Sequence, residues 1–257
     1  MPERLQKLIA QAGLASRRQA EAWIADGRVL VNGTVSQLGD RADLAHDNII
    51  VNGRKLSVAE EKITVLLNKP RGYISTLKDP QGRDLVTDLV ADLQQRLFPI
   101  GRLDYNTEGL LLLTNDGDLS QRLSHPRHHV EKTYLVKVRG SLTEQKICSL
   151  RDGILLNDGK TQPARVANVR NGRATSWFEL TIREGRNRQV RRMCEAVDLQ
   201  VVRLKRVRIG FLELGNVATG RYRILTSQEV DKLKKLVQIK KQPPPFNEGI
   251  GTPMSGR

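Results

Sequence analysis

The chain has 257 residues, of which 43 are lysine or arginine and 28 are aspartate or glutamate, so its formal net charge is +15 at pH 7. It contains no apolar run near the roughly 20 residues of a transmembrane helix and only two cysteines, which excludes a membrane span, a disulfide scaffold and a cysteine-rich zinc site. The amino terminus lacks a basic segment followed by an apolar one, which predicts a cytoplasmic protein. Such a basic chain is expected to bind a polyanion.

The first 60 residues predict a small module of two helices and a hairpin sheet. Apolar residues recur at helical spacing, with Leu5, Leu8, Ile9 and Ala12 in the first helix and Ala20, Trp23 and Ile24 in the second. Ser16 and Gln19 have capping-box spacing at the start of the second helix. Asn-Gly pairs at residues 32–33 and 52–53 predict two tight turns between short strands.

A mixed arrangement of strands and helices follows, which predicts an α+β fold with a mixed or antiparallel sheet and not a regular βαβ array. The expected strands include residues 63–67, 134–138, 178–182 and 200–209, and the expected last helix is residues 226–237. The predicted domains are residues 1–60 and 61–240, followed by a disordered tail at 241–257 with three consecutive prolines.

The positive charge is unevenly distributed along the chain. Residues 1–60 carry +1 and residues 61–164 carry +2, whereas residues 165–223 have 14 basic and 5 acidic side chains and carry +9. A concentrated basic segment is typical of a surface that binds nucleic-acid phosphates. The alternative is a charged face that is only solvated.

Asp104 lies in a glycine-bracketed loop, residues 101–109, that leads into four consecutive leucines. A carboxylate flanked by polar residues and followed by a buried strand is typical of a reactive side chain presented by a rigid scaffold. The alternative is that Asp104 only caps a turn.

Residues 183–197 predict a helix with one apolar and one basic face. Its apolar face is Val190, Met193, Cys194 and Val197, and its basic face carries Arg188, Arg191 and Arg192. Nine basic and three acidic residues lie between Arg183 and Arg208, which favours a continuous cationic surface for phosphates. Tyr134, in the expected strand, is by default a core aromatic residue.

Three segments, in this order, resemble motifs of the pseudouridine synthases that modify ribosomal RNA. They are Gly-Arg-Leu-Asp-Tyr-Asn-Thr-Glu-Gly at 101–109, Glu-Lys-Thr-Tyr-Leu-Val at 131–136 and Glu-Gly-Arg-Asn-Arg-Gln-Val-Arg-Arg-Met at 184–193. The resemblance covers residues 3–237, and residues 1–60 resemble the RNA-binding domain first recognised in ribosomal protein S4. Asn-Arg-Gln-Val-Arg at 187–191, where some relatives have Tyr-His-Gln-Val-Lys, makes the chain more similar to large-subunit than to small-subunit enzymes.

The resemblance implies a role for individual residues. Asp104 matches the nucleophile, Tyr134 the tyrosine that stacks on the base and manages a proton, and Arg191 the basic partner of the catalytic carboxylate. A nucleophilic carboxylate must be ionised, which a guanidinium within about 4 to 6 Å favours. The expected RNA contacts are Arg102, near the stack that the flipped base leaves, and Arg17, Arg18, Arg186, Arg188 and Arg192.

The implied reaction moves a bond within one nucleotide, so no cofactor and no metal are predicted. The expected partner is large-subunit ribosomal RNA, free or in an assembly intermediate, bound by a monomer. Two alternatives are a non-catalytic RNA-binding factor in ribosome assembly and a synthase that acts on small-subunit or transfer RNA. The resemblance leaves open which uridine is the target and whether Asp104 attacks the ribose or the base.

Overall fold

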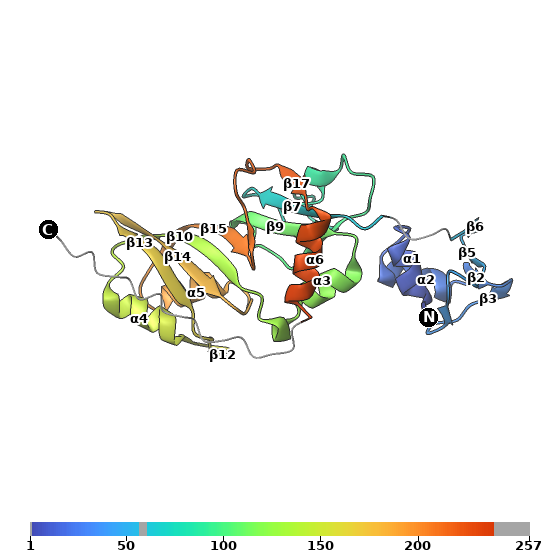
Figure 1. The fold of residues 1–257 in the computed structure, drawn as a ribbon, viewed down its shortest axis with the longest axis horizontal. Helices are drawn as coiled ribbons and strands as arrows, with labels where there is room; N and C mark the ends of the chain where they lie inside the picture. Colours follow the sequence, from blue (N-terminus) through green and yellow to red (C-terminus); the bar gives the residue numbers. More distant parts are fainter. Residues whose placement is uncertain (1, 57–60, 239–257) are drawn as a thin grey trace.

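A computed structural model of the chain describes residues 2–56 and 61–238. Figure 1 shows a small N-terminal domain beside a larger domain built on one extended sheet. The tail predicted at residues 241–257 lies outside the described residues. The same is true of residues 57–60, where the predicted domain boundary falls, so that boundary stays a prediction.

The N-terminal domain has the predicted two helices and hairpins. Its helices are α1 (Leu5–Gln11) and α2 (Arg17–Ala25), and its strands are β1 (Glu3–Arg4), β2 (Val29–Val31), β3 (Thr34–Val35), β4 (Arg41–Ala42), β5 (Ile49–Val51) and β6 (Arg54–Lys55). Strand β1 pairs with β4, and the other four form a sheet in the order β3-β2-β5-β6. The Ser16 hydroxyl accepts a hydrogen bond from Gln19 N at 3.1 Å, as the capping pattern predicts.

Both Asn-Gly turns form as predicted. Asn32 and Gly33 have φ of 52° and 86°, and Asn52 and Gly53 have 51° and 76°. Positive φ at both central residues is the geometry of a type I′ turn, whose twist matches that of the flanking strands. The two turns therefore close the hairpins β2–β3 and β5–β6.

The larger domain contains a nine-stranded sheet in the order β13-β14-β10-β15-β9-β7-β17, with β8 paired to β9 and β16 to β15. Its strands are β7 (Thr64–Lys69), β8 (Phe98–Ile100), β9 (Glu108–Thr114), β10 (Lys132–Arg139), β13 (Arg165–Asn171), β14 (Thr175–Ile182), β15 (Val201–Ile209), β16 (Leu212–Glu213) and β17 (Tyr222–Ile224), and β11 (Leu155–Leu156) and β12 (Gly159–Lys160) form a separate hairpin. Neighbouring strands are antiparallel except β9 and β15, which are parallel. The predicted α+β fold with a mixed sheet is confirmed.

The sheet is covered on both faces, which explains why the four leucines of β9 are all buried. Leu111 and Leu113 pack in one hydrophobic cluster, and Leu110 and Leu112 in another, because alternate residues of a strand point to opposite faces. Helices α3 (Gly117–Ser124) and α6 (Ser227–Leu236) contribute to the cluster that contains Leu110. Helices α4 (Glu144–Asp152) and α5 (Gln189–Glu195) contribute to the other. The remaining helical turns are η1 (Asp88–Val90) and η2 (Pro126–His128).

Two predicted helices are present with slightly different bounds. Helix α6 is capped by Thr226 through a capping box with Glu229. Helix α5 buries Val190, Met193 and Cys194 as predicted, but it is shorter than residues 183–197: it begins at Gln189, after Arg188, and ends before Val197, which is partly buried against the same cluster.

Strand pairing brings the three motifs of the larger domain together. Gly109 lies opposite Arg206 in the parallel pair β9–β15, and Arg206 lies opposite Tyr134 in the antiparallel pair β15–β10. Gly109 has φ of 102°, and a Cβ there would overlap the Arg206 backbone, so only glycine allows the two strands to approach this closely. The loop that precedes β9 is thereby placed near Tyr134.

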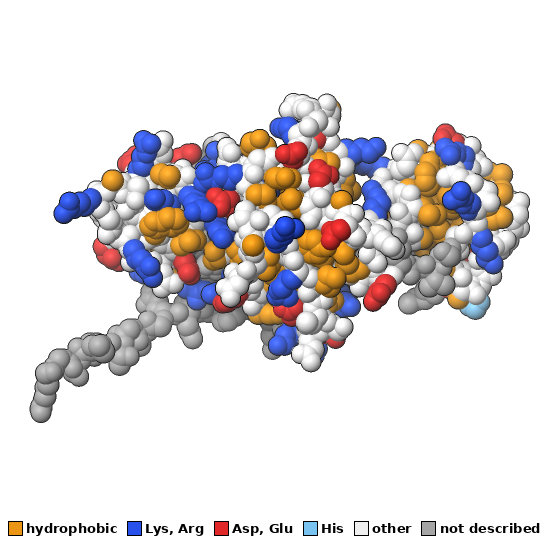
Figure 2. Space-filling view, turned by 90° about the horizontal axis from the view of Figure 1, so that it is seen from above, with side chains coloured by type: hydrophobic (Ala, Val, Ile, Leu, Met, Phe, Trp, Pro, Cys, Tyr) orange, Lys and Arg blue, Asp and Glu red, His pale blue; other side chains and the backbone are white. Residues whose placement is uncertain are grey.

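The surface of the molecule carries basic side chains on both domains. Lysines and arginines lie on every part of the face seen in Figure 2, with acidic side chains among them.

At the boundary of the two domains, Lys7 Nζ of α1 lies 3.3 Å from Asp118 Oδ1 of α3. In residues 2–56 and 61–238, no helix is both long and apolar enough to cross a bilayer.

Candidate active site

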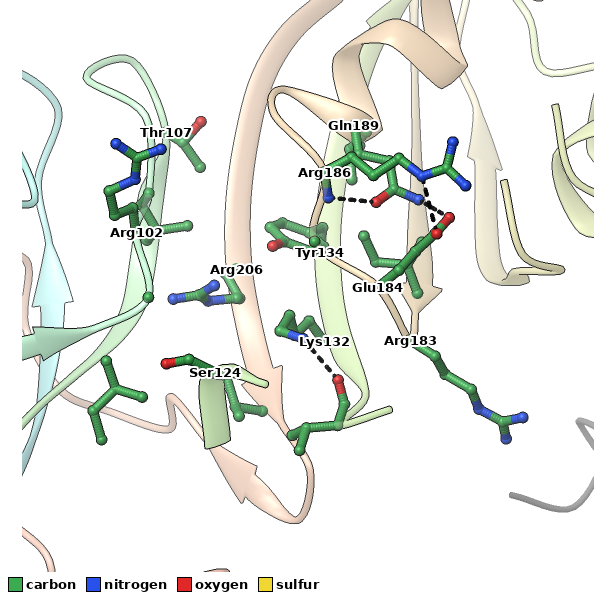
Figure 3. A pocket seen from close by; sticks show the side chains of 18 of the residues that line it. Arg102, Thr107, Ser124, Lys132, Tyr134, Arg183, Glu184, Arg186, Gln189 and Arg206 are labelled. Atoms are coloured by element: carbon green, nitrogen blue, oxygen red, sulfur yellow. Dashed lines mark hydrogen bonds and ion pairs between the residues drawn. The ribbon is translucent and has the colours of Figure 1, made fainter. Parts of the chain in front are cut away.

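A cavity of about 200 Å³ lies where the three motifs meet. It is bounded by the loop before β9, by β10 and β15, and by the loop between β14 and α5 (Figure 3). Five of the residues singled out in the sequence line it, namely Arg102, Asp104, Tyr134, Arg186 and Arg188. Arg191 is not part of the lining, and Arg17 and Arg18 belong to the N-terminal domain.

Asp104 is held in place by the backbone of its own loop. The carbonyl oxygens of residues 103–107 all accept hydrogen bonds: Leu103 from Ser75 Oγ, Asp104 and Thr107 from Lys69 Nζ, Tyr105 from Gly72 N, and Asn106 from Arg191 Nη2. Thr107 N also donates to Asp104 O at 3.0 Å. The side chain of Asp104 remains partly exposed in the cavity. The loop therefore presents one carboxylate from a fixed backbone.

Lys69, at the end of β7, is the central support of this loop. It is fully buried, and its Nζ donates to the carbonyl oxygens of Pro70, Thr107 and Asp104 at 2.9, 3.0 and 3.2 Å. Burial lowers the pKa of Lys69 to about 8, although the carboxylates of Asp104 and Glu108 act in the opposite direction. Nothing in the sequence distinguishes Lys69, because a single lysine at the end of an apolar strand normally points to solvent.

Glu108, the first residue of β9, is 6 % exposed and binds two arginines. Arg203 donates to its two oxygens at 3.0 and 2.8 Å, and Arg71 Nε lies 2.8 Å from Oε1. The hydrogen bonds from Arg203 are the largest cause of the lowered pKa of Glu108. This ion pair joins β9 to β15 beside the Asp104 loop.

Tyr134 is both a core residue and part of the cavity wall. Its side chain is 8 % exposed and belongs to the hydrophobic cluster under β10, yet it also lines the cavity. Figure 3 shows its ring between Gln189 on one side and Lys132 and Arg206 on the other. A buried aromatic face at a cavity wall can stack on a planar base.

Arg191 lies close to Asp104 without forming an ion pair with it. Its Nη2 donates to Asn106 O at 3.0 Å, and no contact within 4.0 Å joins it to the Asp104 carboxylate among the described residues. Burial and the positive charge of Arg188 lower the pKa of Arg191, which the negative charge of Asp104 opposes. Arginine remains protonated despite such shifts, so Arg191 supplies a fixed positive charge near the loop.

The predicted continuous cationic surface is wrong in part. Arg206 is 4 % exposed, and several other arginines of the basic segment form ion pairs with acidic side chains. These pairs are Arg183–Glu131, Arg192–Asp158, Arg203–Glu108, Arg208–Glu213 and Arg223–Glu229. Glu131, Asp158 and Glu108 lie far from their arginine partners in the sequence, so a charge count over residues 183–208 does not include them.

The predicted RNA contacts fall into two groups in the structure. Arg186 binds Glu184 and Asp158, and Arg192 binds Asp158 and Asn157, so these two also hold the hairpin β11–β12. The others have exposed side chains, namely Arg17, Arg18, Arg102 and Arg188. Contact of either group with RNA stays a prediction.

The histidines between α3 and β10 do not form a metal site in the structure. His125 and His128 have ring centroids 6.1 Å apart, and the His125 ring accepts from Arg127 N at 3.2 Å. Among residues 2–56 and 61–238, no three histidine, cysteine, aspartate or glutamate side chains lie close enough to hold a metal ion.

Comparison with known proteins identifies the protein family to which the chain belongs. The family model for RNA pseudouridylate synthase matches residues 63–196, and that for the S4 domain matches residues 3–49. The chain belongs to the RNA pseudouridylate synthase family, whose members are isomerases, and it carries an N-terminal S4 domain.

Individual relatives are similar over nearly the whole chain. Ribosomal large subunit pseudouridine synthase B of Bacillus subtilis is 49% identical over 237 residues, which are 91% of this chain and 96% of that protein. The protein of the same name from Pseudomonas aeruginosa is 44% identical, over 93% of this chain and 63% of its own length. A crystal structure of a pseudouridylate synthase has 35% identity and a TM-score of 0.64, and the match covers 90% of this chain and 99% of that one.

Proposed function

We propose that this enzyme isomerises one uridine of large-subunit ribosomal RNA to pseudouridine, with Asp104 as the nucleophile. The observation that carries the proposal is that Asp104 and Tyr134 line one cavity, in a chain closely similar to proteins named for that activity. An enzyme that acts on ribosomal RNA is expected to work in the cytoplasm. We take a monomer to be the active form because all proposed catalytic residues belong to one domain.

The reaction breaks the bond between N1 of the uracil and C1′ of the ribose and forms a bond between C5 and C1′. The proton on C5 is lost and N1 gains one, so atoms and electrons balance without an oxidant or a reductant. The base must leave the RNA stack first, which costs a few kcal/mol and less in a loop than in a helix. In this proposal, the base enters the cavity and stacks on Tyr134, while the exposed Arg102 at the rim binds the RNA around it.

The remaining residues set the position and charge of the nucleophile. Hydrogen bonds from Lys69 and Arg191 to the carbonyl oxygens of residues 104, 106 and 107 fix the loop. Both side chains also place positive charge near the Asp104 carboxylate. Arg191 therefore acts as a positioning residue as well as an electrostatic one.

The substrate is tested by mapping pseudouridines in a strain that lacks the gene. We expect one pseudouridine to disappear from large-subunit RNA and to return when the wild-type gene is restored. Reverse-transcription stops after a pseudouridine-specific modification would locate it. Loss of a site only in small-subunit or transfer RNA would reject the large-subunit substrate, and no loss at all would favour a non-catalytic assembly factor.

Phosphate binding by the exposed arginines is tested by salt dependence. Replacing Arg188 by alanine is expected to raise the Kd for RNA and to reduce the slope of log K against log salt by about 0.7 to 0.9, the value of one phosphate contact. Arg151→Ala, on an exposed turn of α4, is the matched control and should leave the slope unchanged. A slope that Arg188→Ala does not alter would contradict a phosphate contact.

A further inference from the structure

Two cations line the inner part of the cavity without a carboxylate partner. They are Lys132, the first residue of β10, and Arg206 of β15. Glu131, which precedes Lys132 in the sequence, pairs with Arg183, and Glu184, which also lines the cavity, binds Arg186 and Gln189. Among the described residues, neither Lys132 nor Arg206 lies within 4.0 Å of an acidic side chain.

Arg206 is the more deeply buried of the two. Its side chain is 4 % exposed, and Nε donates to Leu110 O at 2.7 Å. Nη2 is buried and has no hydrogen-bond partner in the part of the chain that the structure describes. An unsatisfied charged donor in the interior is energetically unfavourable. Such a group is expected where a bound molecule supplies the acceptor.

Lys132 faces the same space. Its Nζ makes one hydrogen bond, to Val130 O at 2.9 Å, which leaves two of its three protons available. Burial, and then the positive charge of Arg206, lower the pKa of Lys132 to about 8. Figure 3 shows both side chains pointing toward the space beside the Tyr134 hydroxyl. Two like charges held together in this way favour binding of an electron-rich group.

The location of Lys132 and Arg206 indicates that the electron-rich group they bind is the base and not a phosphate. Lys132 and Tyr134 are two residues apart on one face of β10, and Arg206 is the cross-strand neighbour of Tyr134. A uracil stacked on Tyr134 would therefore have its edge beside both cations. The RNA backbone would lie instead at the rim, where Arg102 and Arg188 are exposed.

We propose that Lys132 and Arg206 bind the carbonyl oxygens of the target uracil and stabilise the negative charge that the ring acquires during the reaction. This inference rests on the proposed function and adds two substrate-binding catalytic residues to it. When the N1–C1′ bond breaks, its electron pair stays on the ring and is shared with the oxygens on C2 and C4. If Asp104 adds to C6 of the base instead, negative charge develops on the oxygen on C4. The negative charge disappears when C5 bonds to C1′, C5 loses its proton and N1 takes one up.

The pair would also select uracil over cytosine. Both Lys132 and Arg206 present only hydrogen-bond donors, which match the carbonyl oxygen on C4 of uracil. Cytosine has an amino group at that position, and a donor facing two cationic donors would be left without an acceptor.

The test is Lys132→Met, assayed under single-turnover conditions on ribosomal RNA from the strain that lacks the gene. Removing one preorganised donor from developing negative charge is expected to lower the rate of pseudouridine formation about 10²-fold. The Kd for RNA should change less than about threefold, because phosphate contacts dominate RNA affinity. Lys132→Arg retains the charge and should stay within about tenfold of wild type.

Lys137→Met is the matched control, since Lys137 lies on the same strand against Trp177 and outside the cavity. It should match wild type in both rate and affinity. Circular dichroism and Tm are recorded for each variant, and if Lys132→Met is unfolded, the comparison is made with Lys132→Gln and Arg206→Lys. Wild-type rates in Lys132→Met, or a defect confined to RNA affinity, would overturn the inference.

A fluorinated substrate separates charge stabilisation from simple contact. RNA transcribed with 5-fluorouridine carries a base that holds negative charge more readily, so the rate deficit of Lys132→Met should shrink on it, measured as disappearance of 5-fluorouridine. An equal deficit on both substrates would count against the role. If wild-type enzyme forms no pseudouridine in either subunit's RNA, the proposed function fails, and this inference fails with it.

Discussion

Replacing Asp104 by asparagine is expected to lower the rate of pseudouridine formation by about 10⁴-fold or more, the scale seen when a catalytic nucleophile is removed. Asparagine has nearly the same shape, and the hydrogen bonds of the loop use backbone carbonyls and not the Asp104 side chain. The Kd for RNA and the Tm should therefore stay close to those of wild type. Single-turnover product formation, filter binding and thermal melting measure the three quantities.

A surface carboxylate provides the matched control for this variant. Asp152→Asn, at the exposed end of α4, makes the same chemical change outside the cavity and should leave all three quantities unchanged. Substantial product from Asp104→Asn would reject Asp104 as the nucleophile. A large fall in Tm would show instead that the side chain supports the loop.

The features that the sequence predicted correctly depend on neighbours in the chain. The capping residue Ser16 and both Asn-Gly turns are local signals, and each forms as expected. The run of leucines after Asp104 predicts a buried strand, and every residue of β9 is buried.

The features that the sequence did not predict depend on distant contacts. Arg203 is bound by Glu108, which lies 95 residues away, so local charge counting overstated the cationic surface. Arg191 contacts the loop through Asn106, a backbone interaction that no side-chain pattern encodes. Lys132 and Arg206 gain significance only because β10 and β15 pair in a register that places both beside Tyr134.

Lys69→Met is expected to damage both stability and catalysis. The substitution removes the donor that satisfies the buried carbonyls of residues 70, 104 and 107, each worth about 1 to 3 kcal/mol when left unpaired. Part of this is offset because the variant no longer buries a charge. We expect the free energy of unfolding at pH 7, measured in urea, to fall by about 2 to 4 kcal/mol.

Catalysis by Lys69→Met should fall more than RNA binding. A displacement of about 1 Å in a reacting group can lower a rate about 10²-fold, and Lys69 fixes the backbone that carries Asp104. The hydrogen bonds of Lys69 go to backbone carbonyls and not to the exposed arginines proposed to bind phosphates, so the Kd for RNA should be near that of wild type. Lys78→Met, on an exposed loop, is the control, and a Lys69→Met enzyme as stable and active as this control would contradict the supporting role.

The stability difference between wild type and Lys69→Met should also depend on pH. The pKa of Lys69 is about 8 in the folded protein and near its ordinary 10.5 in the unfolded chain. Between these values the unfolded chain binds more protons at this site, so wild-type stability gains up to about 1.4 kcal/mol per pH unit, a gain that the variant lacks. The gap between the two unfolding free energies should therefore widen from pH 8 to pH 10 and be constant below pH 7. Because other titrating groups are common to both proteins, they cancel in the difference, and a constant gap across this range would show that Lys69 is not held charged in a buried site.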